Sequence, residues 1–498
     1  MAEIHEITAA EIARLARVSR TTVSNWRRRH DDFPGPVGGT DTRPTFDRDE
    51  VERWLEDGGR LPPTTPFESV WNRIRSMAEG QEREELLADV LSVLLFRMED
   101  MLGRHPDYPL TWSDLVDDED APGWLRGAMK ETLVGSKQAE EDRVPEFFSG
   151  NQEGLIRLCR EVGAMADSLD RARKLADFLF TAHLQESKGG REDPPAPLAR
   201  LMAALGGVDD GQWGRWGAPD RGQVLDPSCG SGSLLVEARH RRAHETSGQE
   251  GDRSIARLAG ARIDIAAGRP TDSLRPGSAL LADAFPGRKF GVVLCKPPFG
   301  QKYWGAEQLA VDERWVYGTP PRAESELAWV QHCLSHAETG GRVVVLLPPA
   351  VASRGSGRRI RAEFLRRGAL RAVVALPPGA AQPAHVPLQL WVLEPPAAGA
   401  APPTRMLMLD AAGGKGGEGG ALDWEKLSAT VLEAWHEFAD DPENVTPESA
   451  RRRAVPVIEL LDDEVDLTPA RHLPTVDRRT EPEAVLRTAN AARDRLAR

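Results

Sequence analysis

Several features that define other protein classes are scarce in this chain of 498 residues. Its four cysteines, Cys159, Cys229, Cys295 and Cys333, are too few and too scattered for a disulfide framework or a zinc cluster. It has no run of roughly 18 apolar residues, and the start M-A-E-I-H-E lacks a basic and then apolar signal pattern. We therefore expect reduced, mostly buried thiols, no bound metal, no membrane contact and a cytoplasmic location.

An excess of positive charge is also missing. The net charge is −13, which argues against coating of nucleic acid over the whole surface and confines any DNA contact to local basic patches. Charged residues make up 28% and hydrophobic residues 40% of the chain, as in ordinary soluble globular proteins. The length predicts roughly two to four domains.

The first basic patch lies in residues 1–60. Apolar residues at helical spacing in residues 7–18 predict one helix, and Ser19 is the expected N-cap of a second helix that buries Val23 and Trp26. No acidic residue interrupts this second helix. Its other face carries side chains that can reach base edges and phosphates, namely Arg20, Thr21, Thr22, Ser24, Asn25, Arg27 and Arg28.

A Gly/Pro-rich stretch that begins F-P-G-P-V follows and predicts a hairpin, and then a helix capped near Asp47 with D-E-V-E-R-W-L on it. This order of elements resembles the winged helix-turn-helix of the excisionase and MerR-like group. The resemblance implies a DNA-binding domain, of a kind that often works as a dimer on two half-sites. A small helical module that binds protein is the alternative.

Three further regions follow a proline-marked linker. Residues 67–185 alternate apolar and charged residues at helical spacing and predict a helical domain without a catalytic group. Residues 190–410 predict an α/β domain with a doubly wound sheet. After a glycine-rich linker, residues 422–498 predict a helical C-terminal region that packs on the helical domain or pairs with a partner helix.

The first candidate ligand-binding motif is Q-V-L-D-P-S-C-G-S-G-S-L-L-V-E-A, residues 223–238. An apolar strand ends at Asp226, a glycine turn follows, and Leu234 and Leu235 begin a helix. In doubly wound folds, ligands settle at the carboxyl ends of strands, and glycines let the backbone approach them. D-P-S-C-G-S-G resembles the motif by which S-adenosylmethionine-dependent amino-methyltransferases hold the methionine part of their cofactor.

A second strand-and-loop unit, V-L-C-K-P-P-F-G, occupies residues 293–300 and is followed by three more predicted strands. With V-D-L-T-P-A-R-H-L at residues 465–473, this order resembles the modification subunits of type I restriction systems and related N6-adenine DNA methyltransferases, over roughly residues 140–475. The resemblance implies a Rossmann-like class I methyltransferase fold, S-adenosylmethionine as cofactor, double-stranded DNA as partner and a separate specificity or effector subunit.

The resemblance also assigns residues. It implies that a flipped adenine stacks on Phe299 and that Pro297 O accepts one hydrogen of the N6 amine. The catalytic loop is Lys296, Pro297, Pro298 and Phe299. The expected cofactor-binding residues are Asp226, Pro227, Ser228, Cys229, Gly230, Gly232, Asp264 and Asp283.

Lys296 departs from the family, which has Asn or Asp there to accept the other N6 hydrogen. An ammonium has three donors and no acceptor, and its charge would stand beside a sulfonium. One such repulsion at about 4 Å is worth roughly 4 kcal/mol at an effective dielectric near 20, or on the order of a thousandfold in rate. A lysine left neutral by burial would be able to accept, which is the alternative.

Two further departures accompany the lysine. G-A-R-I-D-I, residues 260–265, places Arg262 where the family has an acid that binds the cofactor ribose, with Asp264 as a substitute. R-E-D-P-P-A-P, residues 191–197, has no threonine where the family has Thr-Pro. Asp283 remains where an acid often contacts the cofactor adenine.

These departures favour a DNA-binding protein built on a methyltransferase scaffold, a pseudoenzyme with impaired or absent methyl transfer, weak or lost cofactor binding and a regulatory or defence role. An active S-adenosylmethionine-dependent adenine-N6 methyltransferase of a restriction-modification-like system is the alternative. Methylation of RNA or protein amines is a third hypothesis, which the resemblance to DNA enzymes disfavours.

A second basic patch, residues 353–371, begins with a Gly/Ser loop and becomes an arginine-rich helix. Because it follows a strand end, Arg354 and Arg358 are expected near the ligand side of the sheet and near DNA phosphates, together with Arg359, Arg361, Arg366 and Arg367. A solvated helix face is the alternative.

Overall fold

The computed structural model describes most of the chain in two units. The described residues are 6–16, 18–30, 32–40, 43–60, 65–78, 80–103, 112, 152–186, 193–208, 221–269, 271, 274–381, 386–397, 399–411, 422–445 and 451–473. One unit is Met1–Asn72 and the other is Arg73–Arg498. Among the described helices, none combines the length and apolar character that crossing a bilayer requires.

The first unit combines three helices with a small antiparallel sheet. Its elements are β1 (Glu6–Thr8), α1 (Ala9–Leu15), α2 (Arg20–Arg29), β2 (Pro36–Thr40), β3 (Arg43–Asp47) and α3 (Arg48–Asp57), with strand order β1-β3-β2. Ser19 caps α2, as predicted, by accepting a hydrogen bond from Thr22 N at 3.1 Å. Val23 is buried, whereas Trp26 is half-buried and meets the Trp54 ring edge-on at 5.7 Å.

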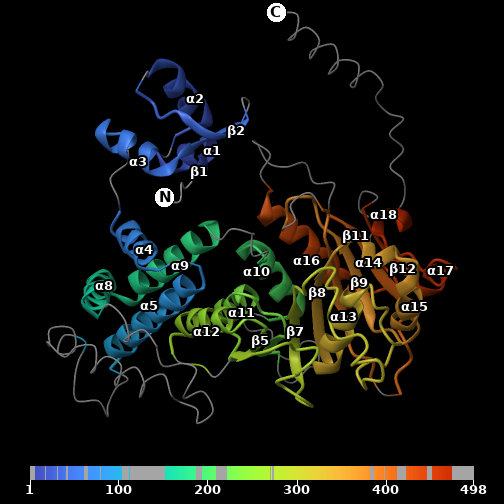
Figure 1. Cartoon of the computed structure of the whole chain (residues 1–498). Helices are drawn as coiled ribbons and strands as arrows, with labels where there is room; N and C mark the ends of the chain where they lie inside the picture. The colour runs from blue at the N-terminus through green and yellow to red at the C-terminus, as the bar shows by residue number, and fades with distance from the viewer. Residues whose placement is uncertain are drawn as a thin grey trace, which may run out of the picture. The chain divides into compact units, whose positions relative to one another are not determined.

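The second unit is built on a nine-stranded mixed sheet with the order β12-β11-β9-β10-β8-β7-β4-β5-β6. The chain colour accordingly changes from green at β5 to orange at β12 across it (Figure 1). Only β10 and β12 run antiparallel to their neighbours. The strands are β4 (Gln223–Asp226), β5 (Glu245–Glu250), β6 (Leu274–Pro276), β7 (Phe290–Cys295), β8 (Ala337–Leu347), β9 (Leu370–Ala375), β10 (Gln389–Leu393), β11 (Arg405–Asp410) and β12 (Arg452–Pro456).

Alternation along the strands supplies a core on each face of this sheet. In β7, Val293 packs with the helices of one face and Val292 with those of the other. The first face is covered by α13 (Ser325–His336) and α15 (Arg358–Arg366), and the second by α10 (Ala196–Gly206), α11 (Ser233–His240) and α16 (Trp424–Asp440). The sheet with helices on both faces is the doubly wound fold that the sequence predicts.

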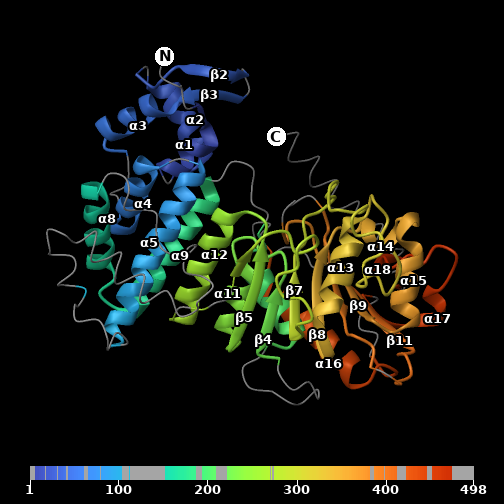
Figure 2. The same cartoon turned by 60° about the horizontal axis from the view of Figure 1, so that its bottom comes forward.

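A helical layer lies beside this sheet domain (Figure 2). It contains α5 (Gly80–Met101), α8 (Gln152–Met165) and α9 (Leu169–Glu186), and α4 (Pro66–Met77) precedes it. The layer meets the sheet domain where Arg257 of α12 (Arg253–Ala267) pairs with buried Asp89 of α5. The remainder of the predicted helical domain, between residues 104 and 151 apart from Trp112, lies outside the described residues.

Two expectations from the sequence are wrong. Residues 422–498 are not purely helical, because β12 extends the sheet by pairing antiparallel with β11. The short helices of this region are α17 (Val457–Leu460) and α18 (Pro469–His472), and another short helix, α14 (Ala350–Ser353), follows β8. Residues 260–265 lie inside α12 and do not directly follow the second strand. Asp252 caps that helix by accepting hydrogen bonds from Ser254 N and Ile255 N, and the second strand is β5.

Candidate cofactor and substrate site

Three strand ends meet at one edge of the large sheet. β4 pairs in parallel with both β5 and β7, so that their carboxyl ends lie together. These ends are Asp226, Glu250 and Cys295, and Lys296 follows directly. Ligands of doubly wound folds bind at this edge.

The loop after β4 is shaped by its glycines. Asp226 is 1% exposed, and its Oδ1 accepts a hydrogen bond from Ser228 N at 3.1 Å. Gly230 and Gly232 have φ values of 52° and 82°, a region that glycine adopts without strain. Gly232 directly precedes α11, and Cys229 N donates to Gln249 O at 3.0 Å, which fixes the loop against β5.

The acid that follows the second strand is Glu250, which the sequence interpretation missed. Its Oε2 accepts a hydrogen bond from Gly230 N at 3.0 Å, and its Oε1 accepts one from Asp252 N at 3.0 Å. The available signal was an acid about 20 residues after the glycine loop, the usual place of a ribose-binding carboxylate. A carboxylate therefore lies at the carboxyl end of β5, whereas Arg262 lies inside α12.

Arg262 instead donates hydrogen bonds to the glycine loop and to the first residue of α11. Its Nη1 donates to Ser231 O at 3.2 Å and to Ser233 Oγ at 3.0 Å. Its guanidinium also lies 3.7 Å from the centroid of the Phe180 ring. Burial lowers the pKa of Arg262 to about 10, still high enough to keep the group charged at neutral pH.

A second acid lies over the same loop. Asp193, directly before Pro194, occupies the place expected for the family's Thr-Pro. Its Oδ1 accepts a hydrogen bond from Ser231 N at 3.4 Å, and its Oδ2 accepts one from Ser231 Oγ. A Cβ on Gly230 would lie 2.7 Å from Asp193 Oδ1, so a side chain there would displace the carboxylate.

The carboxylates of this edge act on one another. Burial raises the pKa of Asp226 well above its usual range, nearby Glu250 and Asp193 raise it further, and the charge of Lys296 opposes them. The edge thus gathers acidic groups around the glycine loop. A ligand that carries cationic groups suits such an edge.

Two predicted cofactor residues do not join this group. Asp264 lies in the last turns of α12, about 18 Å along the helix from its cap at Asp252, and accepts hydrogen bonds from Thr271 N at 2.7 Å and Thr271 Oγ1 at 2.5 Å. Asp283 pairs with His336, which directly precedes β8 at the amino edge of the sheet. Asp264 is thus held away from the glycine loop. In contrast, the backbone on both sides of Asp283 bonds to the side chain of Gln249, whose backbone carbonyl accepts from Cys229 N of that loop.

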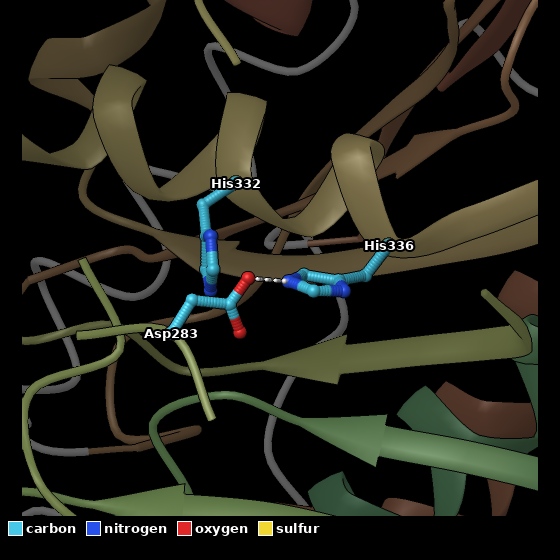
Figure 3. A group of neighbouring side chains, drawn as sticks. All are labelled: Asp283, His332 and His336. Carbon is cyan, nitrogen blue, oxygen red and sulfur yellow. Dashed lines mark ion pairs between the residues drawn. The ribbon is translucent and has the colours of Figure 1, made fainter. Parts of the chain in front are cut away.

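Asp283, His332 and His336 form the group that comes nearest to a metal site among the described residues, with ligand atoms within 4.8 Å of one another (Figure 3). His336 Nε2 lies 3.1 Å from Asp283 Oδ2. However, Arg314 Nη1 lies 3.0 Å from His332 Nδ1, and a guanidinium only donates. The proton of His332 therefore lies on Nε2, which faces Asp283, so this nitrogen has no lone pair for a metal (Figure 3).

The K-P-P-F loop is held by the first turn of α13. Gly300 N donates to Glu326 Oε1 at 2.8 Å, and Gln301 N donates to Ser325 Oγ at 3.1 Å. Lys296 and Phe299 are half-buried, and Lys296 Nζ lies 4.9 Å from the centroid of the Phe299 ring. The structure therefore brings the lysine and the ring of this loop together. Pro297 is buried and Pro298 exposed.

The second basic patch divides into exposed and structural arginines. Arg354 and Arg358 are exposed, and they donate to Ala323 O and Asp463 O respectively. Arg361 is 0% exposed, so its place among DNA-contacting side chains was wrongly predicted. It donates to Val465 O at 2.8 Å and to Arg354 O at 2.7 Å, which joins the 463–467 segment to the patch.

In the first unit, α2 shows the polar face that the sequence predicts. Thr22 and Asn25 are half-buried, and Arg28 Nη2 donates to Asn25 Oδ1 at 2.7 Å. The exposed residues of this face are Arg20, Thr21, Ser24, Arg27 and Arg28. Their geometry is compatible with contact to nucleic acid.

The fold and the loop at Asp226 define a Rossmann-like class I methyltransferase architecture. A family model described as N-6 DNA Methylase matches residues 180–478, more than half of the chain. The chain belongs to this N-6 DNA methylase family.

Individual relatives agree with this assignment. The methylase subunit of the type I restriction enzyme HindI of Haemophilus influenzae is 30% identical over 190 residues, which cover 35% of this chain and 42% of that protein. The MjaIX methylase subunit of Methanocaldococcus jannaschii is 26% identical over 220 residues, which cover 41% of this chain and 37% of that protein. The matches thus span less than half the length of these curated relatives.

Solved structures support the fold. The methyltransferase subunit of a type I restriction-modification system from Streptococcus thermophilus superposes with a TM-score of 0.63 at 18% identity, covering 82% of this chain and 98% of that chain. A modification subunit of a putative type I restriction enzyme from Vibrio vulnificus gives 0.60 at 17% identity, covering 82% and 97%.

Proposed function

We propose that this chain binds double-stranded DNA and S-adenosylmethionine on its methyltransferase scaffold, and that Lys296 keeps methyl transfer to adenine N6 impaired or absent. The observation that carries the proposal is the position of Lys296 Nζ, 4.9 Å from the centroid of the Phe299 ring. The same side chain that withholds an acceptor from the amine also lies against the ring on which the adenine would stack.

The cofactor side of the site is better preserved than the catalytic loop. Gly230 and Gly232 permit close approach of the methionine part of S-adenosylmethionine, and Glu250 is placed to accept hydrogen bonds from its ribose hydroxyls. Asp226, Pro227, Ser228 and Cys229 complete the loop. We expect cofactor binding to be retained, although Asp193 and Glu250 already hold amides of the loop.

The catalytic side lacks one of its two acceptors. When bound, the cofactor would supply an electrophilic methyl group on its sulfonium. Transfer to the N6 lone pair would leave the sulfur as a neutral thioether and release the N6 proton to solvent. Pro297 O would accept one N6 hydrogen, and Phe299 would stack on the base. An ammonium at Lys296 donates instead of accepting, so it leaves the lone pair delocalised into the ring.

DNA contact would come from both units. The first unit, taken as a winged helix-turn-helix, would place Arg20, Thr21, Thr22, Asn25, Arg27 and Arg28 of α2 at DNA, and a second copy would occupy a second half-site. Arg354 and Arg358 would contact phosphates near the catalytic edge. A specificity or effector subunit as partner, a cytoplasmic location and a regulatory or defence role complete the proposal.

An active adenine-N6 methyltransferase is the second candidate. The filled acidic position at Glu250 favours it, because this removes one of the sequence departures that argued for loss of function. The two candidates share the cofactor and the DNA, and they differ only in turnover.

Two measurements on the purified full chain test the proposal. Isothermal titration should show S-adenosylmethionine binding, while tritiated methyl transfer to genomic DNA that lacks prior modification stays at background. Robust incorporation that Phe299→Ala abolishes would establish the active enzyme and overturn impaired transfer. Retention of labelled DNA by the same preparation tests the binding function separately.

A further inference from the structure

The segment after Phe299 is fixed to the start of α13 at several points. Besides the anchors of Gly300 and Gln301, Trp304 is 2% exposed and its Nε1 donates to Arg322 O at 3.0 Å. Trp304 also meets the Trp315 ring edge-on at 6.1 Å. The backbone between residues 300 and 304 is therefore held on both sides of Tyr303.

Tyr303 projects outward from this fixed backbone. Its side chain is 87% exposed, in contrast to Trp304 beside it. The other described tyrosine of the same segment, Tyr317, is 7% exposed and packs on Phe364. A large aromatic ring that is held in solvent by an anchored loop contributes little to the fold, and tyrosine is a residue type enriched at interfaces.

The loops around Tyr303 carry positive charge at the same edge of the sheet. Lys302 is exposed beside it. Two of these loops bond to the backbone at residues 322 and 323. Trp304 Nε1 donates to Arg322 O, and Arg354 Nη1 donates to Ala323 O at 3.4 Å. Arg322 itself pairs with Glu307 at 2.9 Å, whereas Lys302 and Arg354 are exposed basic side chains of these loops.

We propose that Tyr303 stacks on a nucleic-acid base next to the adenine that approaches Phe299, while Lys302 and Arg354 contact the flanking phosphates. This inference rests on the proposed DNA-binding function and adds a residue to it. Every base offers a π-face, so such stacking supports binding at many sequences. The ring lies four positions beyond Phe299 on anchored backbone, so both aromatic residues belong to the loop that follows β7.

The test compares variants of the full chain by fluorescence anisotropy on two labelled probes, a short mixed-sequence duplex and an oligodeoxyadenylate single strand. Tyr303→Ala should weaken both complexes at least about fivefold, whereas Tyr303→Phe keeps the stacking ring and should bind as the parent does. Val311→Ala, at a residue 97% exposed in the same segment, is the matched control and should bind as the parent does.

Salt dependence separates stacking from charge. Tyr303→Ala should leave the slope of log K against log salt unchanged, whereas Lys302→Gln should reduce its magnitude by about 0.7 to 0.9. Parent chain that binds both probes, together with Tyr303→Ala that binds them equally well, overturns the stacking role and leaves the proposed function standing. Parent chain that binds neither probe overturns both, and the exposed ring then belongs to a protein contact.

Discussion

The ammonium of Lys296 lies 4.9 Å from the centroid of the Phe299 ring, so a cation rests against the aromatic group that the family resemblance assigns to the target adenine. A cation over a ring face is favourable by roughly 0.5 to 2 kcal/mol, which an incoming base would have to replace. The buried carboxyl of Asp226 is close enough for Lys296 to oppose the rise of its pKa. The lysine therefore interacts favourably with both the Phe299 ring and Asp226 at the position where we propose that it obstructs transfer.

Replacement of this lysine by the family's residue should restore turnover. Lys296→Asn supplies an acceptor for the N6 amine and removes the positive charge, so tritiated methyl incorporation into unmodified genomic DNA should rise by about 10- to 1000-fold. Lys296→Met is the control, because it removes the charge without adding an acceptor. If Lys296→Asn still binds S-adenosylmethionine but its methyl transfer stays at background, Lys296 is not the cause of impaired transfer.

Glu250 should determine cofactor affinity. In Glu250→Gln, the amide oxygen can still accept from Gly230 N, but the charge that would bind ribose hydroxyls is gone. S-adenosylmethionine should bind about 10- to 100-fold more weakly in isothermal titration. Glu245→Gln, at the other end of β5 where the carboxylate pairs with Arg288, is the matched control and should keep the parent affinity. Equal losses in both variants would contradict the assigned role.

His332 should make the chain less stable in acid. Burial and the neighbouring His336 and Arg314 lower its pKa from 6.5 to about 3. Between these two pH values, His332 is protonated in the unfolded chain and neutral in the folded chain. The free energy of unfolding therefore falls by about 1.4 kcal/mol per pH unit as the pH drops through this window. In His332→Gln, whose oxygen can accept from Arg314, urea-unfolding midpoints should fall less steeply from pH 6.5 towards 3.

The parallel core could be predicted because its sequence carries the signal of burial. Val292 to Cys295 form a continuous apolar run, and β7 is buried at each position. In contrast, β5 reads E-T-S-G-Q-E, which lacks an apolar period, although Thr246 and Gln249 are buried. The second strand therefore could not be recognised from the sequence, and the family's acidic position was sought at residues 260–265, which lie inside α12.

The candidate site was predicted where its residues are consecutive. The loops at Asp226 and Lys296 each lie in one stretch of sequence, and the structure brings them together at one edge. Asp193 could not be assigned in this way, because only the three-dimensional fold places it over Ser231. The partner of Asp283 could not be predicted for the same reason, since His336 comes from α13.

The first unit should contribute phosphate contacts through α2. Arg20 is exposed in the first turn of this helix, next to the cap at Ser19. If its guanidinium contacts a phosphate, Arg20→Gln should weaken binding of mixed-sequence duplex and reduce the salt slope by about 0.9. Arg53→Gln removes the same charge from an exposed position on α3 of the same unit and should leave the slope unchanged, since only α2 is assigned to DNA. Equal changes in both variants would indicate a general effect of net charge and contradict a specific role of α2.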